Sequence, residues 1–163
     1  MSPDDGRGKD TSLRKQLVKL MTGGQAHVDF ETAVAKLSPE HRGQKPPGAP
    51  HTPWQLLEHV RIAQWDILEF SRNPRHVSPK WPEGYWPKDS APSDAGSWER
   101  SLAGFRSDLD SFRELVEDSA IDLHAPIAGG TGQTLLREAM LLADHNAYHV
   151  GQLVLVRRLL DAW

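Results

Sequence analysis

Apolar residues recur at steps of three and four in four separate segments of this chain, and no segment alternates apolar and polar residues as a strand does. This spacing places apolar side chains on one face of an α-helix. The first segment spans about residues 12–37, the second opens at Thr52, the third covers residues 98–116, and the fourth runs from near Thr134 to Leu160. Four amphipathic helices of this length predict an all-α fold, a four-helix bundle.

Each segment has an expected inward face. The first presents Leu13, Leu17, Leu20, Phe30 and Val34, with a weak or kinked middle at Gly23-Gly24. The second presents Leu56, His59, Ala63, Ile67 and Phe70, and its start is marked by a capping box, Thr52 with Gln55, and by Pro53 at the first helical position. The third presents Trp98, Leu102, Phe105, Leu109, Phe112 and Val116. The fourth presents Leu135, Leu142, His145, His149, Gln152, Leu153, Val156 and Leu160.

Two proline-rich loops, at about residues 38–51 and 72–92, separate these helices. Proline removes a backbone donor and fixes φ, so each loop interrupts helix on both sides. The second loop is long enough to run the whole length of a bundle, since an extended residue spans up to about 3.3 Å. It is therefore expected to be a crossover that makes the second and third helices parallel.

The length and the charge limit the classes of function. A chain of 163 residues predicts a single domain over residues 1–163, with a polar N-terminal tail at residues 1–11. No apolar run approaches the ~20 residues of a membrane span, and no secretory signal opens the chain, so we expect a cytoplasmic protein without a membrane partner. Its 19 Lys and Arg residues are scattered and its net charge is −3, which argues against a nucleic-acid partner.

Histidine carries the main chemical signal. His145 and His149 are four residues apart, so their rings lie one turn apart on one helical face and can converge on one ion. Such a pair alone is more often a pair of hydrogen-bonded core histidines. Here both rings lie in the apolar stripe, and His59 occupies an inward position of the second helix. Burying three unpartnered rings costs about 1–3 kcal/mol each, and a divalent cation would satisfy all three.

Three neutral imidazoles suit Zn, Ni, Fe or Co and leave coordination positions open, as in a catalytic site. Gln152 and Glu138 lie on or beside the same stripe, where either could orient a ligand or accept a proton. For Glu138 the alternative is a solvent-facing position beside Arg137. Asn146 and Tyr148 flank the stripe, and structural roles are expected for them.

The other histidines and the tryptophans receive weaker interpretations. His27 could border the metal cavity, whereas loop positions make ligand roles improbable for the remaining four, which are His41, His51, His76 and His124. Trp81 and Trp86 of the second loop either roof the site or pack as ordinary loop aromatics.

The run DHNAYHVGQLVLVRRLL at residues 144–160, with WQLLEHVRIAQWDILEF around His59, closely resembles the DinB-like (DinB/YfiT) superfamily of four-helix-bundle metalloenzymes. The resemblance covers about residues 12–160. It implies that His59, His145 and His149 bind a divalent metal, that a crossover joins the second and third helices, and that a homodimer forms. Members of the superfamily include transferases that use glutathione, bacillithiol or mycothiol, and a thiol-dependent maleylpyruvate isomerase.

The resemblance implies a metal-dependent enzyme acting on a small molecule, a thiol-dependent S-transferase or a related metal-assisted hydrolase, because a bound cation lowers the pKa of a thiol or of water. The chain has no cysteine, so a thiolate would have to come from a low-molecular-weight thiol cosubstrate. One alternative is a metal-binding or small-ligand-binding module without turnover. Another is that the histidines only fill a polar core.

Overall fold

The computed structural model describes the backbone of residues 4–163 and the side chains of residue 8 and residues 10–163. Within that range the chain forms six helices and no strand. They are α1 (Asp4–Thr22), α2 (Phe30–Val34), α3 (Pro39–Arg42), α4 (Pro53–Arg72), α5 (Ser97–Glu117) and α6 (Leu135–Leu159). The all-α prediction is confirmed. Among the described residues, no helix has the length and apolar character to cross a membrane.

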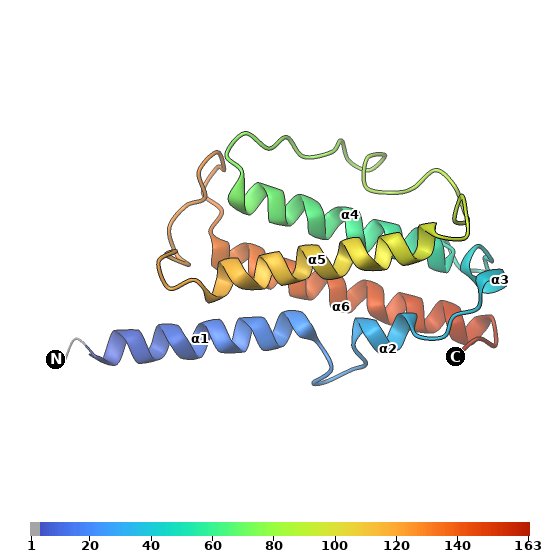
Figure 1. Cartoon of the computed structure of the whole chain (residues 1–163), viewed down its shortest axis with the longest axis horizontal. Helices are drawn as coiled ribbons and strands as arrows, with labels where there is room; N and C mark the ends of the chain where they lie inside the picture. The colour runs from blue at the N-terminus through green and yellow to red at the C-terminus, as the bar shows by residue number, and fades with distance from the viewer. Residues whose placement is uncertain (1–3) are drawn as a thin grey trace.

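The four long helices lie side by side (Figure 1). Helix α4 packs against both α5 and α6, and α1 packs against the same two helices. In Figure 1, α4 and α5 run in one direction and α1 and α6 in the other. The segment between α4 and α5 returns along the length of α4, so its residues lie close to a helix that precedes them in the chain.

The predicted first helix is wrong at both ends. Helix α1 begins at Asp4, inside the expected polar tail, while residues 1–3 lie outside the described part of the chain. It ends at Thr22 because Gly23 and Gly24 adopt φ of 76° and 75°, a conformation that stops a right-handed helix. A new short helix, α2, then begins at Phe30, and the side chain of Asp29 caps it. The Gly pair thus breaks the helix rather than kinking it.

The starts predicted for the other helices are accurate. Both hydrogen bonds of the capping box at Thr52 are present, and Thr134 caps α6 through the backbone N–H of Arg137. Most expected inward residues are buried, but Leu20 is 53% exposed. The reason is that α1 ends two residues later, where the chain turns away from the neighbouring helices before α2 packs on α6.

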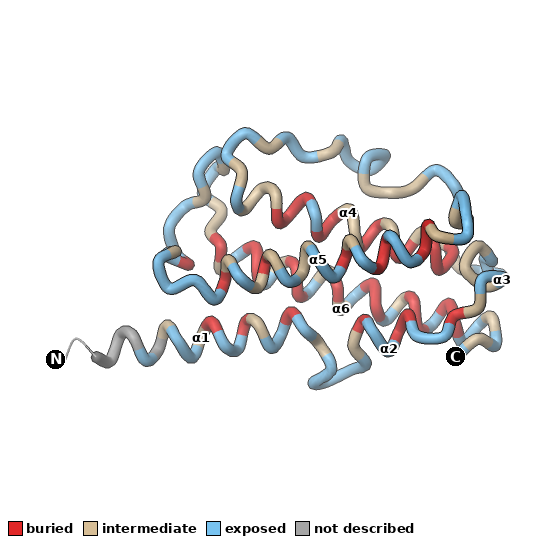
Figure 2. The backbone as a smooth tube through the Cα atoms, viewed as in Figure 1, coloured by how far each residue is buried: buried red, intermediate tan, exposed pale blue. Residues whose placement is uncertain are grey.

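Buried residues recur along the long helices (Figure 2). The apolar ones among them form two clusters. On α6 the first cluster takes residues from Val150 onward, and the second takes residues up to Ala143. Between them lies buried Asn146, whose amide donates to the side chain of Gln64 on α4 at 2.9 Å. A polar layer therefore separates the apolar clusters at the level where α4 faces α6.

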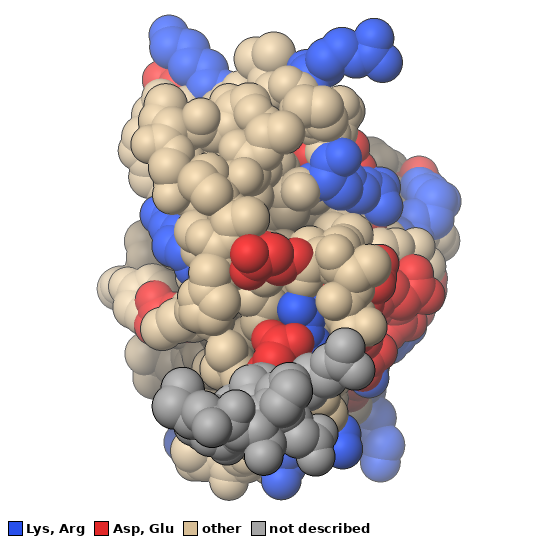
Figure 3. Space-filling model, turned by 90° about the vertical axis from the view of Figure 1, so that its left-hand side faces the viewer, with Lys and Arg blue, Asp and Glu red and all other residues tan. Residues whose placement is uncertain are grey.

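Most charged side chains lie at the surface, but those of Arg14, Asp66, Glu138 and Arg157 are buried. On the end of the molecule seen in Figure 3, acidic and basic side chains are both present among neutral ones.

Candidate metal centre

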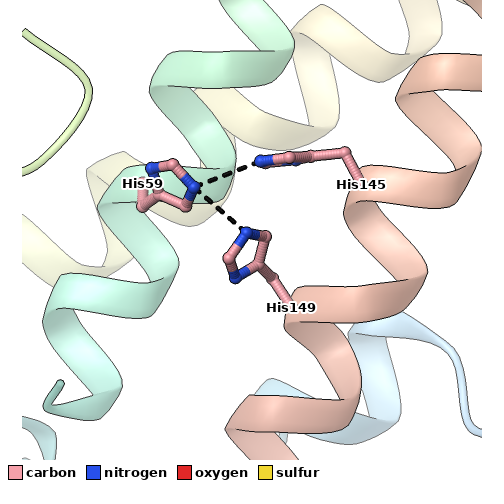
Figure 4. Close-up of side chains that lie close together, drawn as sticks. All are labelled: His59, His145 and His149. Atoms are coloured by element: carbon pink, nitrogen blue, oxygen red, sulfur yellow. Dashed lines mark hydrogen bonds between the residues drawn. The ribbon is translucent and has the colours of Figure 1, made fainter. Parts of the chain in front are cut away.

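Three histidines from two helices converge in the polar layer (Figure 4). His59 comes from α4, and His145 and His149 come from successive turns of α6. The Nε2 atom of His59 lies 3.1 Å from Nε2 of His149 and 3.1 Å from Nε2 of His145. One ligand atom from each ring lies within 4.8 Å of the others. The fold therefore brings together the three histidines that the sequence predicts as metal ligands.

His59 is held in one tautomer by the segment between α4 and α5. Its Nδ1 lies 2.9 Å from the carbonyl oxygen of Tyr85. Because a carbonyl oxygen can only accept, Nδ1 carries the hydrogen and the Nε2 lone pair points into the cluster. The indole of Trp86 stacks on the same ring, with centroids 3.8 Å apart and planes 2° apart.

His149 is oriented in the same way from its own helix. Its Nδ1 lies 2.8 Å from Oε1 of Gln152, which leaves the Nε2 lone pair directed at the cluster. The edge of the Tyr148 ring contacts His149 at a centroid distance of 4.9 Å. Gln152 thus contacts a cluster histidine directly, in the position expected of an orienting residue.

His145 is less firmly held. It is half-buried, and its Nδ1 has no hydrogen-bond partner in the described part of the chain although the atom is buried. His145 therefore lacks the Nδ1 hydrogen bond that fixes the tautomers of His59 and His149.

Burial keeps these rings neutral. Loss of hydration, with a smaller effect of the neighbouring histidines, lowers the pKa of His59 and of His149 to about 4. Loss of hydration also lowers the pKa of His145. At neutral pH the Nε2 lone pairs of His59 and His149 therefore face each other at 3.1 Å without a proton between them.

That arrangement fits a bound cation. With metal–nitrogen bonds of about 2.0–2.1 Å, two imidazole nitrogens on a tetrahedral ion lie about 3.3 Å apart. The observed separations of 3.1 Å are close to this value. Three neutral imidazoles also form a donor set that zinc, nickel, iron and cobalt accept.

Sequence reasoning missed the residues that anchor Tyr85. Its hydroxyl donates to Oδ2 of Asp66 at 2.5 Å, and Oδ1 of Asp66 lies 2.7 Å from Nε2 of His76. Burial and the Asp66 carboxylate raise the pKa of Tyr85 to about 12, so the hydroxyl stays protonated and donates. The one sequence feature that pointed to Tyr85 was the unusual aromatic content of the proline-rich loop at residues 72–92.

The two tryptophans of the segment between α4 and α5 have different positions relative to the histidine cluster. Trp86 covers one face of His59, and His51 stacks on the opposite face of Trp86 at a centroid distance of 3.9 Å. Trp81 is 66% exposed and contacts Tyr85 instead. Trp86 therefore roofs part of the cluster, whereas Trp81 has the loop-packing position.

Glu138 lies two turns before His145 on α6. It is 2% exposed, which excludes the solvent-facing alternative, and Oε1 accepts from the Arg137 guanidinium at 2.6 Å. Burial raises the pKa of Glu138. No hydrogen bond joins Glu138 to the three histidines among the residues that the structure describes.

Three further histidines, His27, His41 and His124, are not part of the cluster. His27 is exposed and bonds to the backbone of Val28, and His41 bonds to Ser38. His124 is exposed in the loop before α6.

Comparison with known protein families gave a match over most of the chain. The family model described as DinB superfamily matches residues 24–153, most of the chain, and the matched range contains all three clustered histidines. Searches of curated proteins and of solved structures gave no match.

Proposed function

The chain belongs to the DinB superfamily, and from this premise we propose that it is a metal-dependent enzyme acting on a small molecule. His59, His145 and His149 hold one divalent cation, which is Zn, Ni, Fe or Co. In this proposal the four long helices form the four-helix bundle of the family, and residues 73–96 form its crossover.

One observation carries the proposal. The Nε2 atoms of His59 and His149 lie 3.1 Å apart, and each ring has its Nδ1 next to an oxygen acceptor. Two unprotonated nitrogens cannot hydrogen-bond to each other, so without a cation this contact would be repulsive. A polar core in which histidines satisfy one another would need a donor at one of these two atoms.

The protein's own groups prepare the site. Tyr85 and Gln152 fix the tautomers of His59 and His149, and Trp86 excludes water from one face of His59. A divalent cation at this position would lower the pKa of water or of a thiol and so supply a nucleophile at neutral pH. Of the two residues expected beside the metal, we assign the positioning role to Gln152 and not to Glu138.

The reaction that we propose is attack of a low-molecular-weight thiol on an electrophilic carbon, which forms a C–S bond, breaks the bond to the leaving group and releases the thiol proton to water. The other reaction is hydrolysis of a small molecule, in which water replaces the leaving group. The absence of cysteine from the chain supports an external thiol in the first case. The test is conjugation of glutathione, bacillithiol or mycothiol to 1-chloro-2,4-dinitrobenzene by the metal-loaded protein. A rate well above that of His149→Ala supports the enzyme.

The second candidate is a metal-binding module without turnover. It is favoured by the position of Glu138, which leaves no carboxylate hydrogen-bonded to the described histidine cluster. Equal conjugation and hydrolysis rates for the wild type and His149→Ala, together with stoichiometric metal in the wild type, would select the binding module.

We also propose a homodimer. Val77 and Trp81 in the segment between α4 and α5 are 85% and 66% exposed, and apolar side chains this exposed are often covered by a partner. Sedimentation velocity of the wild type and of Trp81→Ser tests this: a dimer that Trp81→Ser weakens supports it, and a monomeric wild type contradicts it.

A further inference from the structure

A pocket of about 140 Å³ lies beside the histidine cluster, between the loop before α4 and the last turns of α6. Its apolar wall consists of Ala49, Pro50, Leu56, Leu155, Val156 and Leu159. The two polar side chains that line it are His51 and Gln152. Small-molecule sites commonly combine an apolar wall with a few converging polar groups.

The side chains of Gln152 and His51 connect the pocket to the histidine cluster. Gln152 reaches His149, since its Oε1 lies 2.8 Å from Nδ1 of that ring. His51 stacks on Trp86 at 3.9 Å, and the other face of Trp86 stacks on His59 at 3.8 Å. The polar end of the pocket is therefore continuous with the residues that orient the cluster.

The pocket carries no formal charge. None of its lining residues is Lys, Arg, Asp or Glu, and burial together with nearby Lys45 lowers the pKa of His51, which favours the neutral ring. An ionic group would lose hydration here without gaining a partner. The chemistry of the wall thus selects an apolar group.

The size of the pocket limits that group. An apolar cavity of about 150 Å³ in another protein accommodates benzene, and this pocket is of similar volume, about 140 Å³. Leu155 and Leu159 are 57% and 52% exposed at its rim. A ligand in the pocket would cover apolar surface that the folded chain leaves in water.

We propose that this pocket binds the apolar end of the substrate, an uncharged aromatic ring or an aliphatic chain of about six carbons, while the polar end of the same molecule reaches the metal centre. The inference rests on the proposed function, because it assigns the substrate class of that site. It makes Leu155 and Leu159 determinants of specificity.

The first test uses the zinc-loaded full chain and titration calorimetry with acetohydroxamic, butanohydroxamic and hexanohydroxamic acids. These probes share a metal-binding head and differ in the length of the alkyl tail. We expect affinity to rise about fourfold for each added methylene. Leu155→Asp should reduce the affinity for hexanohydroxamic acid to near that for acetohydroxamic acid. The matched control is Met140→Asp, because Met140 is 56% exposed on the same helix and lies outside the pocket.

The second test does not need the metal. In the metal-free protein, 1-hexanol should shift the methyl resonances of Leu155, Val156 and Leu159 and leave the methyl of Met140 unchanged. Shifts in this set support the pocket even if acetohydroxamic acid fails to bind the zinc-loaded chain, a result that would overturn the proposed metal function alone.

Two results overturn the pocket. One is affinity independent of tail length in the zinc-loaded chain together with no methyl shifts in the metal-free chain. The other is a dimer in sedimentation velocity that both Leu155→Asp and Leu159→Asp dissociate while 1-hexanol shifts nothing, which would make this face an interface between two copies of the chain.

Discussion

The carbonyl oxygen of Tyr85 lies 2.9 Å from Nδ1 of His59, so a residue of the segment between α4 and α5 fixes the tautomer of a histidine on α4. The backbone oxygen is held in place through the Tyr85 side chain, whose hydroxyl donates to Asp66 at 2.5 Å. Because Asp66 and His59 are both on α4, one helix supplies both the histidine and the anchor that orients it.

Loosening this anchor should weaken metal binding. Tyr85→Phe removes the hydroxyl that donates a hydrogen bond to Asp66. The backbone carbonyl of residue 85 is then free to move away from His59. Loss of an outer hydrogen bond of this kind costs about tenfold in metal affinity, which competition with a chromophoric chelator measures. Tyr148→Phe is the matched control, since the Tyr148 side chain is 64% exposed. Equal zinc affinity in Tyr85→Phe and the wild type would contradict the positioning role.

Substitution of Gln152 tests the orientation of His149 more directly, because it changes only the oxygen that accepts the hydrogen bond from Nδ1 of His149. Gln152→Ala leaves Nδ1 of His149 without its acceptor and should lower zinc affinity about 10- to 100-fold. Gln152→Glu keeps an oxygen acceptor and should restore most of the affinity. If the alanine variant binds zinc as tightly as the wild type, or the glutamate variant as weakly as the alanine variant, the hydrogen bond does not orient His149.

The metal-free protein should lose stability on acidification. The pKa of His59 and of His149 is about 4 in the folded chain, against 6.5 in the absence of the fold. Between these values the unfolded chain binds more protons, so the free energy of unfolding falls as the pH drops from about 6.5 to about 4. The slope is at most about 1.4 kcal/mol per pH unit for each histidine, and solvent screening reduces it.

Urea denaturation at pH 7.5 and pH 5 measures this loss. His149→Asn should lose less stability than the wild type between the two pH values, because one of the histidines with a lowered pKa is gone. His59, His145 and His51, whose pKa values are also lowered, remain near this position. His124→Gln, altered at an exposed loop position, should behave as the wild type. A wild-type stability independent of pH across this interval would refute the assignment of buried neutral rings.

The sequence identified the cluster but not its supports. The sequence predicts the three clustered histidines because helical spacing places His59, His145 and His149 on inward faces. It also predicts the start of α4, because Thr52 and Gln55 form a capping box within four residues. The contact of Tyr85 with His59 joins residues 26 positions apart. It depends on the path of a loop, which no local periodicity encodes. The predicted long first helix failed because Gly23 and Gly24 adopt positive φ, which ends α1, and the chain then packs on α6 as a separate helix, α2.

The break after α1 gives a stability prediction with opposite signs at two glycines. Gly23→Ala forces a side chain into φ of 76° and should destabilise the fold by about 1 kcal/mol. Gly8→Ala lies inside α1, where an added Cβ meets nothing within 4 Å, and should stabilise it by about 0.5–1 kcal/mol. Thermal or urea unfolding checks both, and equal effects of the two variants would contradict the conformational explanation.

The central claim is that one divalent cation is shared by histidines of α4 and α6. Elemental analysis of the wild type and of His59→Ala and His145→Ala, each loaded with zinc and dialysed, tests it most directly. The account predicts one metal ion per wild-type chain and much less than one in either variant. Stoichiometric metal in both variants, or none in the wild type after loading with zinc, nickel, iron or cobalt, would contradict it.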